Sequence, residues 1–187
     1  MFGLLQVIIV GIGLAMDAFA VSVSKGLSVQ RLRLRHMLCV GLWFGGFQGL
    51  MPLLGYLLSS NFAHHVANLD HWIAFGLLLL IGINMIREAL SGDDDENGDS
   101  DFGFRTMLLM AIATSIDAFA VGVSFAFLNI SILGAAAIIA LVTMLISAAG
   151  IYLGARVGAK IGSKAGVVGG VMLIAIGVNI LVEHLFV

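Results

Sequence analysis

Six long apolar runs constrain this chain more than any other feature. They fall at residues 3–24, 37–59, 72–90, 105–127, 131–154 and 166–186. Each is close to the ~20 apolar residues that a helix needs to cross a bilayer. The runs are continuous, whereas the strands of a membrane barrel alternate in segments of ~10 residues. The sequence therefore predicts an all-α integral membrane protein with six transmembrane helices.

Charged residues are too few and too clustered for a soluble domain. Only 11% of the 187 residues are charged, against about a quarter in a typical soluble protein. The single cysteine, Cys39, excludes an internal disulfide. Between the apolar runs only short loops remain, which excludes a nucleotide-binding domain and a nucleic-acid binder. We therefore expect no enzymatic activity and no cofactor.

The basic residues predict the orientation of the six helices. All nine lysines and arginines fall at the loops that follow the first, third and fifth runs. Cytoplasmic loops carry an excess of lysine and arginine. We therefore expect these loops to be cytoplasmic and both termini to lie outside. No basic residue precedes Asp17, so we expect residues 3–23 to be a retained helix and not a signal peptide.

An octapeptide occurs twice in the chain. Residues 17–24 read Asp-Ala-Phe-Ala-Val-Ser-Val-Ser, and residues 117–124 differ only by glycine at position 122. Weaker matches pair Leu54-Gly55 with Leu153-Gly154, and Gly82-Ile83-Asn84 with Gly177-Val178-Asn179. Because three crossings are an odd number, a second three-helix unit inserts upside down. We predict two inverted three-helix repeats, residues 1–91 and 105–187, joined by an acidic cytoplasmic loop at 92–104. Such repeats are typical of secondary transporters.

Asp17 and Asp117 are the candidate centre of function. Both lie well inside apolar runs, where a carboxylate is unfavourable by at least ~2.5 kcal/mol and marks ion or proton pathways. Small residues at helical spacing flank both, so we expect the first and fourth helices to approach closely and the carboxylates to meet near a shared axis. The alternative is that each aspartate only caps or hydrogen-bonds a broken helix. The duplication of the acids, without a basic residue at matching depth, favours the functional interpretation.

A cation is the natural ligand of two carboxylates that have no basic neighbour. Other oxygen donors lie at similar depth, and carboxylate, amide and hydroxyl oxygens suit hard divalent ions such as Mg, Ca or Mn. For the amides the alternative role is an interhelical hydrogen bond. The predicted metal ligands, besides the two aspartates, are Gln48, Asn84, Ser115 and Asn179, with Thr114 and Ser147 as further polar groups at usable depth.

Several features have a simpler explanation than a second site. Glycines recur four apart from Gly41 to Gly49 and from Gly150 to Gly170, and they suit helix packing or self-association. Pro52 is expected to break the second helix near Gln48. The acidic stretch 93–101 fits a solvated linker better than a metal sensor. The outer-side group with metal-ligand side chains, taken here as ordinary interfacial residues, comprises His64, His65, Asp70 and His71.

Three segments resemble the bacterial manganese efflux pump family MntP. They are the stretch from Met16 to Ser22, the stretch from Phe44 to Pro52 and the stretch from Ala113 to Gly122. The resemblance covers essentially the whole chain. It implies a multi-pass exporter in the bacterial inner membrane that protects cells from excess Mn²⁺. It also implies that Asp17 and Asp117 form the transport site and that Gln48 lies near them.

Energetics predict how such export is driven. Moving a divalent cation outward against an inside-negative potential requires about 4.6 kcal/mol per 100 mV. A passive pore would therefore admit Mn²⁺, and the chain carries no nucleotide-binding motif. We expect alternating access in which Asp17 and Asp117 bind either Mn²⁺ or protons, with protons moving inward. Export of cadmium, magnesium or a basic amino acid, and a non-transporting membrane scaffold, remain as alternatives.

Overall fold

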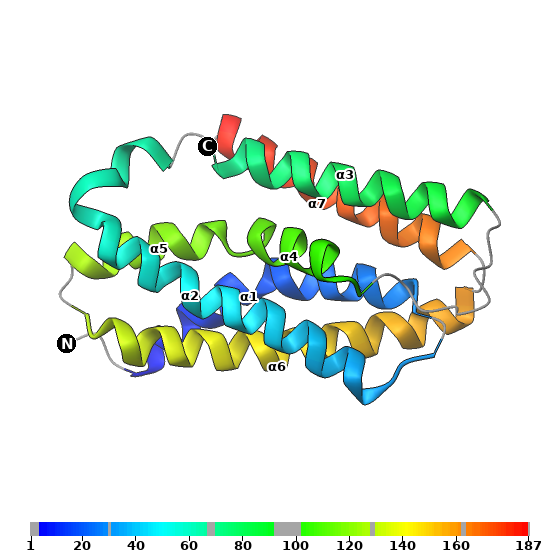
Figure 1. Ribbon diagram of the computed structural model, residues 1–187, viewed down its shortest axis with the longest axis horizontal. Helices are drawn as coiled ribbons and strands as arrows, with labels where there is room; N and C mark the ends of the chain where they lie inside the picture. The colour runs from blue at the N-terminus through cyan, green and yellow to red at the C-terminus, as the bar shows by residue number, and fades with distance from the viewer. Residues whose placement is uncertain are drawn as a thin grey trace.

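The computed structural model is all-helical over the residues it describes, which are 4–29, 31–66, 70–91, 102–127, 130–161 and 164–186. Figure 1 shows long helices that run roughly side by side along one axis of the molecule. The helices are α1 (Leu4–Leu27), α2 (Leu34–Val66), α3 (Asp70–Ser91), α4 (Phe104–Ala113), α5 (Ile116–Phe127), α6 (Ile132–Ile161) and α7 (Ala165–Phe186).

Five of the six predicted runs are confirmed as single helices, with ends within a few residues or extended by up to seven. The fourth run is not. Residues 105–127 form two helices, α4 and α5, separated at Thr114–Ser115 and bent by 48°. Pro52 also behaves differently from the prediction, because α2 continues through it. The helical structure is therefore interrupted at two hydroxyl residues, whereas it continues through Pro52, the only proline of the sequence.

Three helices are long and apolar enough to cross a membrane: α1, α2 and α6. The bent pair α4–α5 makes a fourth span if it is counted as one. These counts concern only the described parts of the chain. They establish a helical membrane protein, which agrees with the all-α part of the first prediction.

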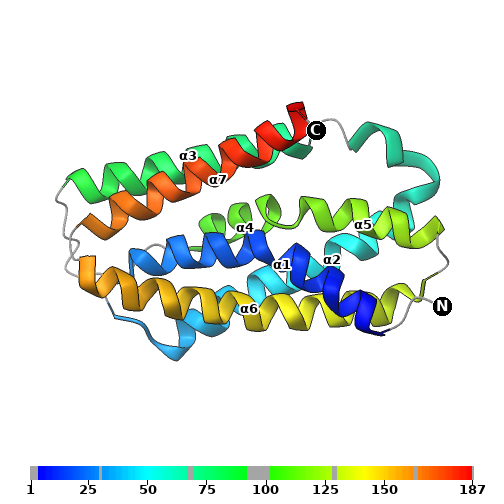
Figure 2. The ribbon, with the colours of Figure 1, turned by 180° about the vertical axis from the view of Figure 1, so that it is seen from behind.

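The helices pair in a pattern that the sequence did not indicate. α1 packs mainly against α6, α5 against α2, and α3 against α7, while α2 and α6 also pack against each other. Figures 1 and 2 show α3 and α7 side by side along one side of the bundle. The expected close approach of the first and fourth helices is wrong, because α1 makes only marginal contact with α4 and α5.

Glycines bring the paired helices together. A side chain at Gly154 would collide with the Val23 carbonyl of α1, and one at Gly122 with the backbone of Pro52. Two small residues of the repeated octapeptides also lie at these contacts, because Ser22 packs against Gly150 of α6 and Gly122 against Pro52 of α2. Close backbone approach through small residues is the usual means of helix association in membranes.

Two apolar cores lie at different heights in the bundle. The larger includes Val29 and Ala155 near the basic loops, together with Leu78 of α3 and Leu173 of α7. The smaller, which includes Val7 and Phe125, contains no described residue of α3 or α7. The α3–α7 pair is thus anchored to the remaining helices through the larger core.

Candidate functional site

The break between α4 and α5 is built by local hydrogen bonds. The Thr114 hydroxyl donates to the carbonyls of Met110 (3.0 Å) and Ala111 (3.3 Å). The Thr114 amide donates to Met110 and the Ser115 amide to Ile112, three residues back. Short hydroxyl side chains compete with the helical hydrogen-bond ladder in this way. The helix therefore tightens, ends at Ala113 and restarts at Ile116.

A single glutamine joins the break to two other helices. The Ser115 hydroxyl donates to Oε1 of Gln48 in α2 (2.8 Å), and Nε2 of Gln48 donates to the Leu14 carbonyl in α1 (3.1 Å). Gln48 and Ser115 are fully buried. We call Gln48, Ser115 and the Leu14 carbonyl the Gln48 bridge. The interhelical hydrogen bond that was the alternative role of Gln48 is thus present.

Proline changes the backbone at the Gln48 bridge without ending α2. Pro52 has no N–H group, so the carbonyl of Gln48, four residues earlier, lacks its normal helical donor. Pro52 also packs directly against Gly122 of α5. The predicted freeing of a backbone carbonyl near Gln48 therefore holds, although the predicted break does not.

Asp117 lies in the first turn of α5 because of the break. Its Oδ1 accepts a hydrogen bond from the Ala118 amide (2.8 Å), and the side chain is half-buried. A carboxylate at a helix N-terminus is favoured by the helix dipole. Asp117 thus lies in the first turn after a break in the helix, which is the backbone setting that the alternative interpretation expects.

Asp17 has the same sequence context and a different backbone. It lies inside the uninterrupted helix α1, one turn after Leu14, and is half-buried. The Gln48 bridge thus contacts a residue one turn before Asp17 and a residue two positions before Asp117. It links the two segments that carry the buried acids.

The remaining predicted ligands lie apart from the Gln48 bridge. Asn179 is exposed on α7. The side chain of Asn84, the acidic stretch 93–101 and the outer-side group (His64, His65, Asp70 and His71) lie outside the part of the chain that is described. Among the described residues, no three His, Cys, Asp or Glu side chains gather as a metal site.

Sequence reasoning passed over two buried hydroxyls of α6. Thr143 was not considered, and Ser147 was noted only for its depth. Both are fully buried, and neither hydroxyl oxygen has a hydrogen-bond partner among the described residues. The register of the repeat was the available signal, because Ser147 precedes Leu153-Gly154 by the same six residues that separate Gln48 from Leu54-Gly55.

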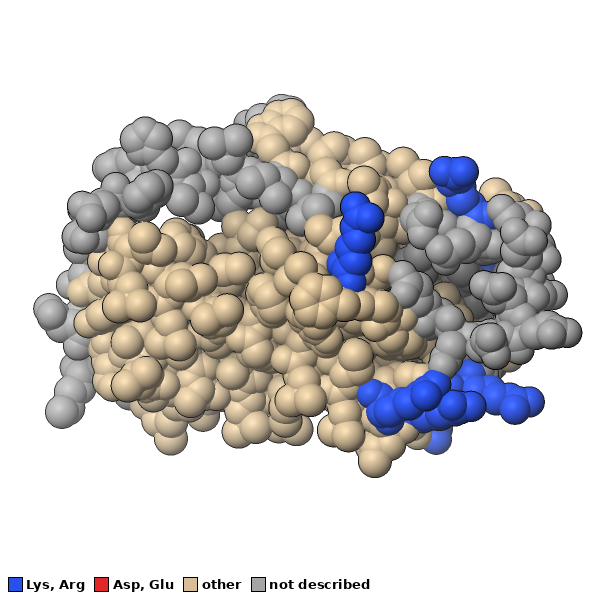
Figure 3. Space-filling view, viewed as in Figure 1, with Lys and Arg blue, Asp and Glu red and all other residues tan. Residues whose placement is uncertain are grey.

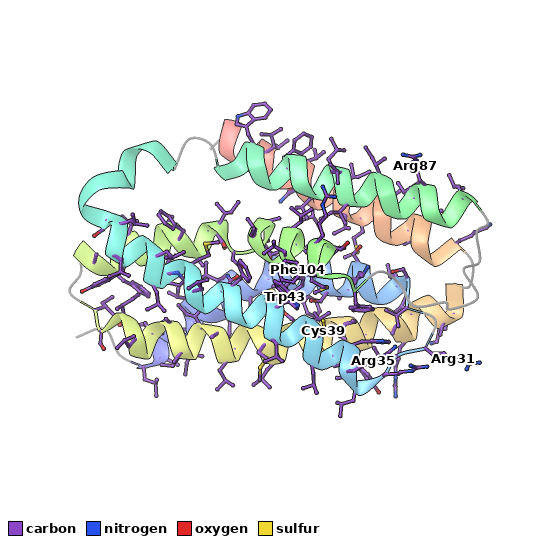
Figure 4. All side chains as sticks on the ribbon, viewed as in Figure 1. Arg31, Arg35, Cys39, Trp43, Arg87 and Phe104 are labelled. Atoms are coloured by element: carbon purple, nitrogen blue, oxygen red, sulfur yellow. The ribbon has the colours of Figure 1, made fainter. Side chains whose placement is uncertain are left out.

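Basic side chains gather toward one end of the molecule. Figure 3 shows lysine and arginine over the right half of this face, and Figure 4 places Arg31, Arg35 and Arg87 there. The chain's N-terminus lies at the opposite end (Figure 1). In Figure 4, Trp43 and Phe104 lie nearer the middle, where their rings meet edge to face at 5.2 Å.

An aromatic contact covers the basic end of α1 and α2. The ring of His36 stacks on Phe102 at 4.6 Å, and Nζ of Lys25 lies 5.3 Å from the same ring. Lys25 and His36 are each only 3% exposed. The segment that leads into α4 is thus held against the ends of α1 and α2.

Comparison with known proteins gives one consistent family. A family model described as "Putative manganese efflux pump" (Mntp) matches residues 31–181. Relatives named "Putative manganese efflux pump MntP" include one from Bifidobacterium adolescentis, 49% identical over 183 residues and 97% of both chains. One from Campylobacter jejuni is 51% identical over 181 residues and 97% of both chains. One from Acetivibrio thermocellus is 48% identical over 97% of this chain and 91% of its own. No solved structure matches.

Proposed function

The chain belongs to the manganese efflux pump family MntP, and from this premise we propose that it is a secondary-active exporter that carries Mn²⁺ out of the cytoplasm in exchange for protons. It is a membrane transporter and not an enzyme. The observation that carries the proposal is the Gln48 bridge, because one buried side chain connects the two segments that hold Asp17 and Asp117.

The site we propose is made of hard oxygen ligands. Asp17 and Asp117 supply the negative charge, and the carbonyl and side-chain oxygens at Gln48 and Ser115 supply neutral ligands. Asn84 and Asn179 are further candidates that α3 and α7 would bring in when the bundle rearranges. Such a ligand set suits a divalent ion of the Mn²⁺ type. Two carboxylates can instead hold two protons, which gives the exchange its chemistry.

The membrane arrangement we propose has six spans in two inverted repeats, 1–91 and 105–187, with both termini outside. The helix pairing supports it, because the first helix of each repeat packs on the middle helix of the other: α1 on α6, and α5 on α2. α3 and α7 have 22 residues each, about 33 Å of helix. That length is enough for a hydrocarbon core of about 30 Å.

Proton coupling follows from the energetics of export. Outward movement of a divalent ion requires about 4.6 kcal/mol per 100 mV of inside-negative potential. Two protons moving inward for each Mn²⁺ would make the exchange electroneutral, and a third would add driving force. The same half-buried carboxylates that bind the ion provide the proton sites.

Cellular metal content tests the export itself. Cells without their own manganese exporter would express the wild type, Asp17→Asn, Asp117→Asn or the loop control Asp94→Asn at matched membrane levels. We expect the wild type and Asp94→Asn to lower manganese in Mn-loaded cells, and both buried variants to leave it high. Mn, Mg, Fe, Zn and Cd are measured together. A fall in another metal alone would name a different substrate, and no change in any metal would favour a scaffold.

Proteoliposomes test the coupling separately. Purified protein is reconstituted in vesicles with Mn²⁺ on one side. Mn²⁺ transport is followed with and without a higher proton concentration on the other side. We expect the gradient to accelerate Mn²⁺ movement and Mn²⁺ to drive protons the other way. Equal Mn²⁺ transport without any proton movement would refute the coupling while leaving export intact.

A further inference from the structure

The hydroxyls of Thr143 and Ser147, one turn apart on α6, are the polar groups of the buried interior that nothing described satisfies. Both residues are 0% exposed, and neither hydroxyl has a hydrogen-bond partner among the described residues. Folded proteins pair nearly all of their buried polar atoms, so each exception requires a physical explanation, and binding of an ion is one of them. We call these two residues the α6 hydroxyl pair.

Other hydroxyls in this protein show what the pair does not do. Ser22, Thr114 and Ser124 each donate to the carbonyl four residues earlier in their own helix. This bond is the ordinary solution for serine and threonine in a helix. The α6 hydroxyl pair has equivalent carbonyls one turn back and does not use them. The two hydroxyls therefore differ from those three hydroxyls by lacking this bond to their own helix.

The contacts of α6 show where the pair points. Ile139 of α6 packs against Gly11 of α1, whereas Ala140 and Met144 pack against Gly45 of α2. Successive residues of a helix are rotated by about 100°. On the surface of α6, Thr143 and Ser147 therefore lie between the side that faces α1 and the side that faces α2. Their hydroxyls thus point into the interior where α1, α2 and α6 meet.

Thr143 lies near the depth of the Gln48 bridge, and Ser147 lies one turn further along α6, near the depth of Asp17. α1 and α6 run in parallel, since Gly11 meets Ile139 and Phe19 meets Gly150. The α1 residues between these contacts include Leu14 and Asp17, and the α6 residues between them include the pair. On α2, Gly49 next to Gln48 packs against Ala140, which is less than one turn from Thr143, and Gly41 packs against Met144, which is less than one turn from Ser147.

The repeat places the serine of the pair where the first unit has its glutamine. Ser147 precedes Leu153-Gly154 by six residues, and Gln48 precedes Leu54-Gly55 by six. In the described structure Gln48 is fully engaged with Ser115 and Leu14, whereas Ser147 is not engaged at all. The second unit thus presents a polar group at the corresponding depth with its hydrogen-bonding capacity unused.

We propose that the hydroxyl oxygens of Thr143 and Ser147 bind the transported divalent cation, as neutral ligands supplied by α6 beside the Gln48 bridge. This rests on the proposed export function and adds a fourth segment to its site. Hydroxyl oxygens bind hard cations without adding charge. They would hold the ion while leaving Asp17 and Asp117 as the only groups that exchange it for protons.

Replacing oxygen by sulfur tests direct contact. Ser147→Cys is made in a Cys39→Ser background, because Cys39 is the only native cysteine, and the protein is reconstituted in vesicles. Soft sulfur ligands favour soft metal ions. We expect Cd²⁺ to inhibit Mn²⁺ transport at a concentration about tenfold lower than in the background protein, and the apparent KM for Mn²⁺ to rise several-fold.

Removal of the hydroxyls gives a second readout with a matched control. Thr143→Val and Ser147→Ala keep approximate shape, and we expect each to raise the apparent KM for Mn²⁺ about three- to tenfold with little change in maximal rate. Thr143→Ser, which keeps the hydroxyl, is expected to behave as the wild type. Ser22→Ala removes a buried hydroxyl that already bonds its own helix, and its KM should not change.

The outcomes separate this inference from the function on which it rests. A wild type that does not move Mn²⁺ refutes the export function. An active wild type with unaltered KM in Thr143→Val and Ser147→Ala, and unaltered Cd²⁺ sensitivity in Ser147→Cys, refutes the α6 ligands alone. If a valine or alanine variant fails to fold, Ser147→Cys still decides the matter, because unchanged Cd²⁺ sensitivity in that variant refutes direct contact.

Discussion

The two copies of the octapeptide have nearly the same sequence and different backbones. Around Asp17 the chain is one uninterrupted helix, whereas Asp117 follows a break and lies in the first turn of α5. The difference originates just before the repeat, where Leu14-Ala15 in the first copy corresponds to Thr114-Ser115 in the second. The two hydroxyls bond the preceding carbonyls and Gln48. A local motif therefore does not fix its own conformation when its neighbours offer the backbone other partners.

The largest effect is expected from making the octapeptides identical. In Gly122→Ser the new side chain would collide with the backbone of Pro52, and overpacking of this kind destabilises by about 2–3 kcal/mol. We expect loss of most folded protein, measured as the yield and melting temperature of detergent-purified protein. The reciprocal Ser22→Gly should lose far less, since it opens space at Gly150. Equal stability of the two variants would show that the copies pack alike.

The second largest difference between the two copies is expected when each aspartate is replaced by the longer glutamate. Oδ1 of Asp117 is held by the Ala118 amide at the start of α5, a geometry that glutamate cannot reproduce. We expect Asp117→Glu to lower the Mn²⁺ export rate at least tenfold. Asp17→Glu, within a regular helix, should retain more activity. The measurement is initial-rate transport in vesicles, and the reverse ranking would contradict the assigned difference between the two sites.

A smaller loss is expected from converting the second copy toward the first at the bridge. Ser115→Ala reproduces the alanine at position 15 and removes the hydroxyl that donates to Gln48. A buried hydrogen bond contributes about 1 kcal/mol, so we expect a decrease in stability of that size. A double-mutant cycle with Gln48→Leu measures the coupling between the two side chains. Additive effects would show that the Ser115–Gln48 bond contributes nothing.

The smallest effect is expected at the bend itself. Thr114→Val removes the hydroxyl bonds to Met110 and Ala111 while keeping side-chain shape. We expect α4 and α5 to straighten partially, so that spin labels at Phe104 and Ser124 move apart by up to about 2–3 Å for two helices of this length. Pulsed dipolar spectroscopy in a Cys39→Ser background makes the measurement. An unchanged separation would assign the bend to Ser115 and Gln48 alone.

The helices were largely predictable, and their partners were not. Continuous apolar runs predict helices because a lipid-exposed chain must satisfy its own backbone, and five of six were confirmed. The prediction of one continuous helix over the fourth run was wrong at Thr114–Ser115. Hydroxyl residues in a helix are compatible with either a straight or a broken backbone. The prediction that Pro52 breaks the second helix was also wrong, since membrane helices tolerate proline when neighbours pack closely around it.

For the candidate site too, the residues were predictable and their contacts were not. Asp17, Asp117, Gln48 and Ser115 were identified from residue type and depth alone, because buried polar groups are rare in apolar runs. The hydrogen bonds of Gln48 to Leu14 and Ser115 could not be predicted, because these partners lie 34 and 67 positions away in the sequence. No local sequence pattern contains such distant partners. Thr143 was missed because a threonine within an apolar run is usually satisfied by its own helix.

By itself, the sequence determined that this protein is a helical membrane protein, which residues carry charge inside it and which family it belongs to. These follow from composition along the chain and from transfer energies that act residue by residue. Only the tertiary structure decided that α1 packs on α6, that the fourth run breaks, and that two buried hydroxyls of α6 lack a hydrogen-bond partner among the described residues. The physical reason is that helix association within a membrane depends on close packing between surfaces and on hydrogen bonds across them. Both are properties of pairs of segments that no single segment encodes.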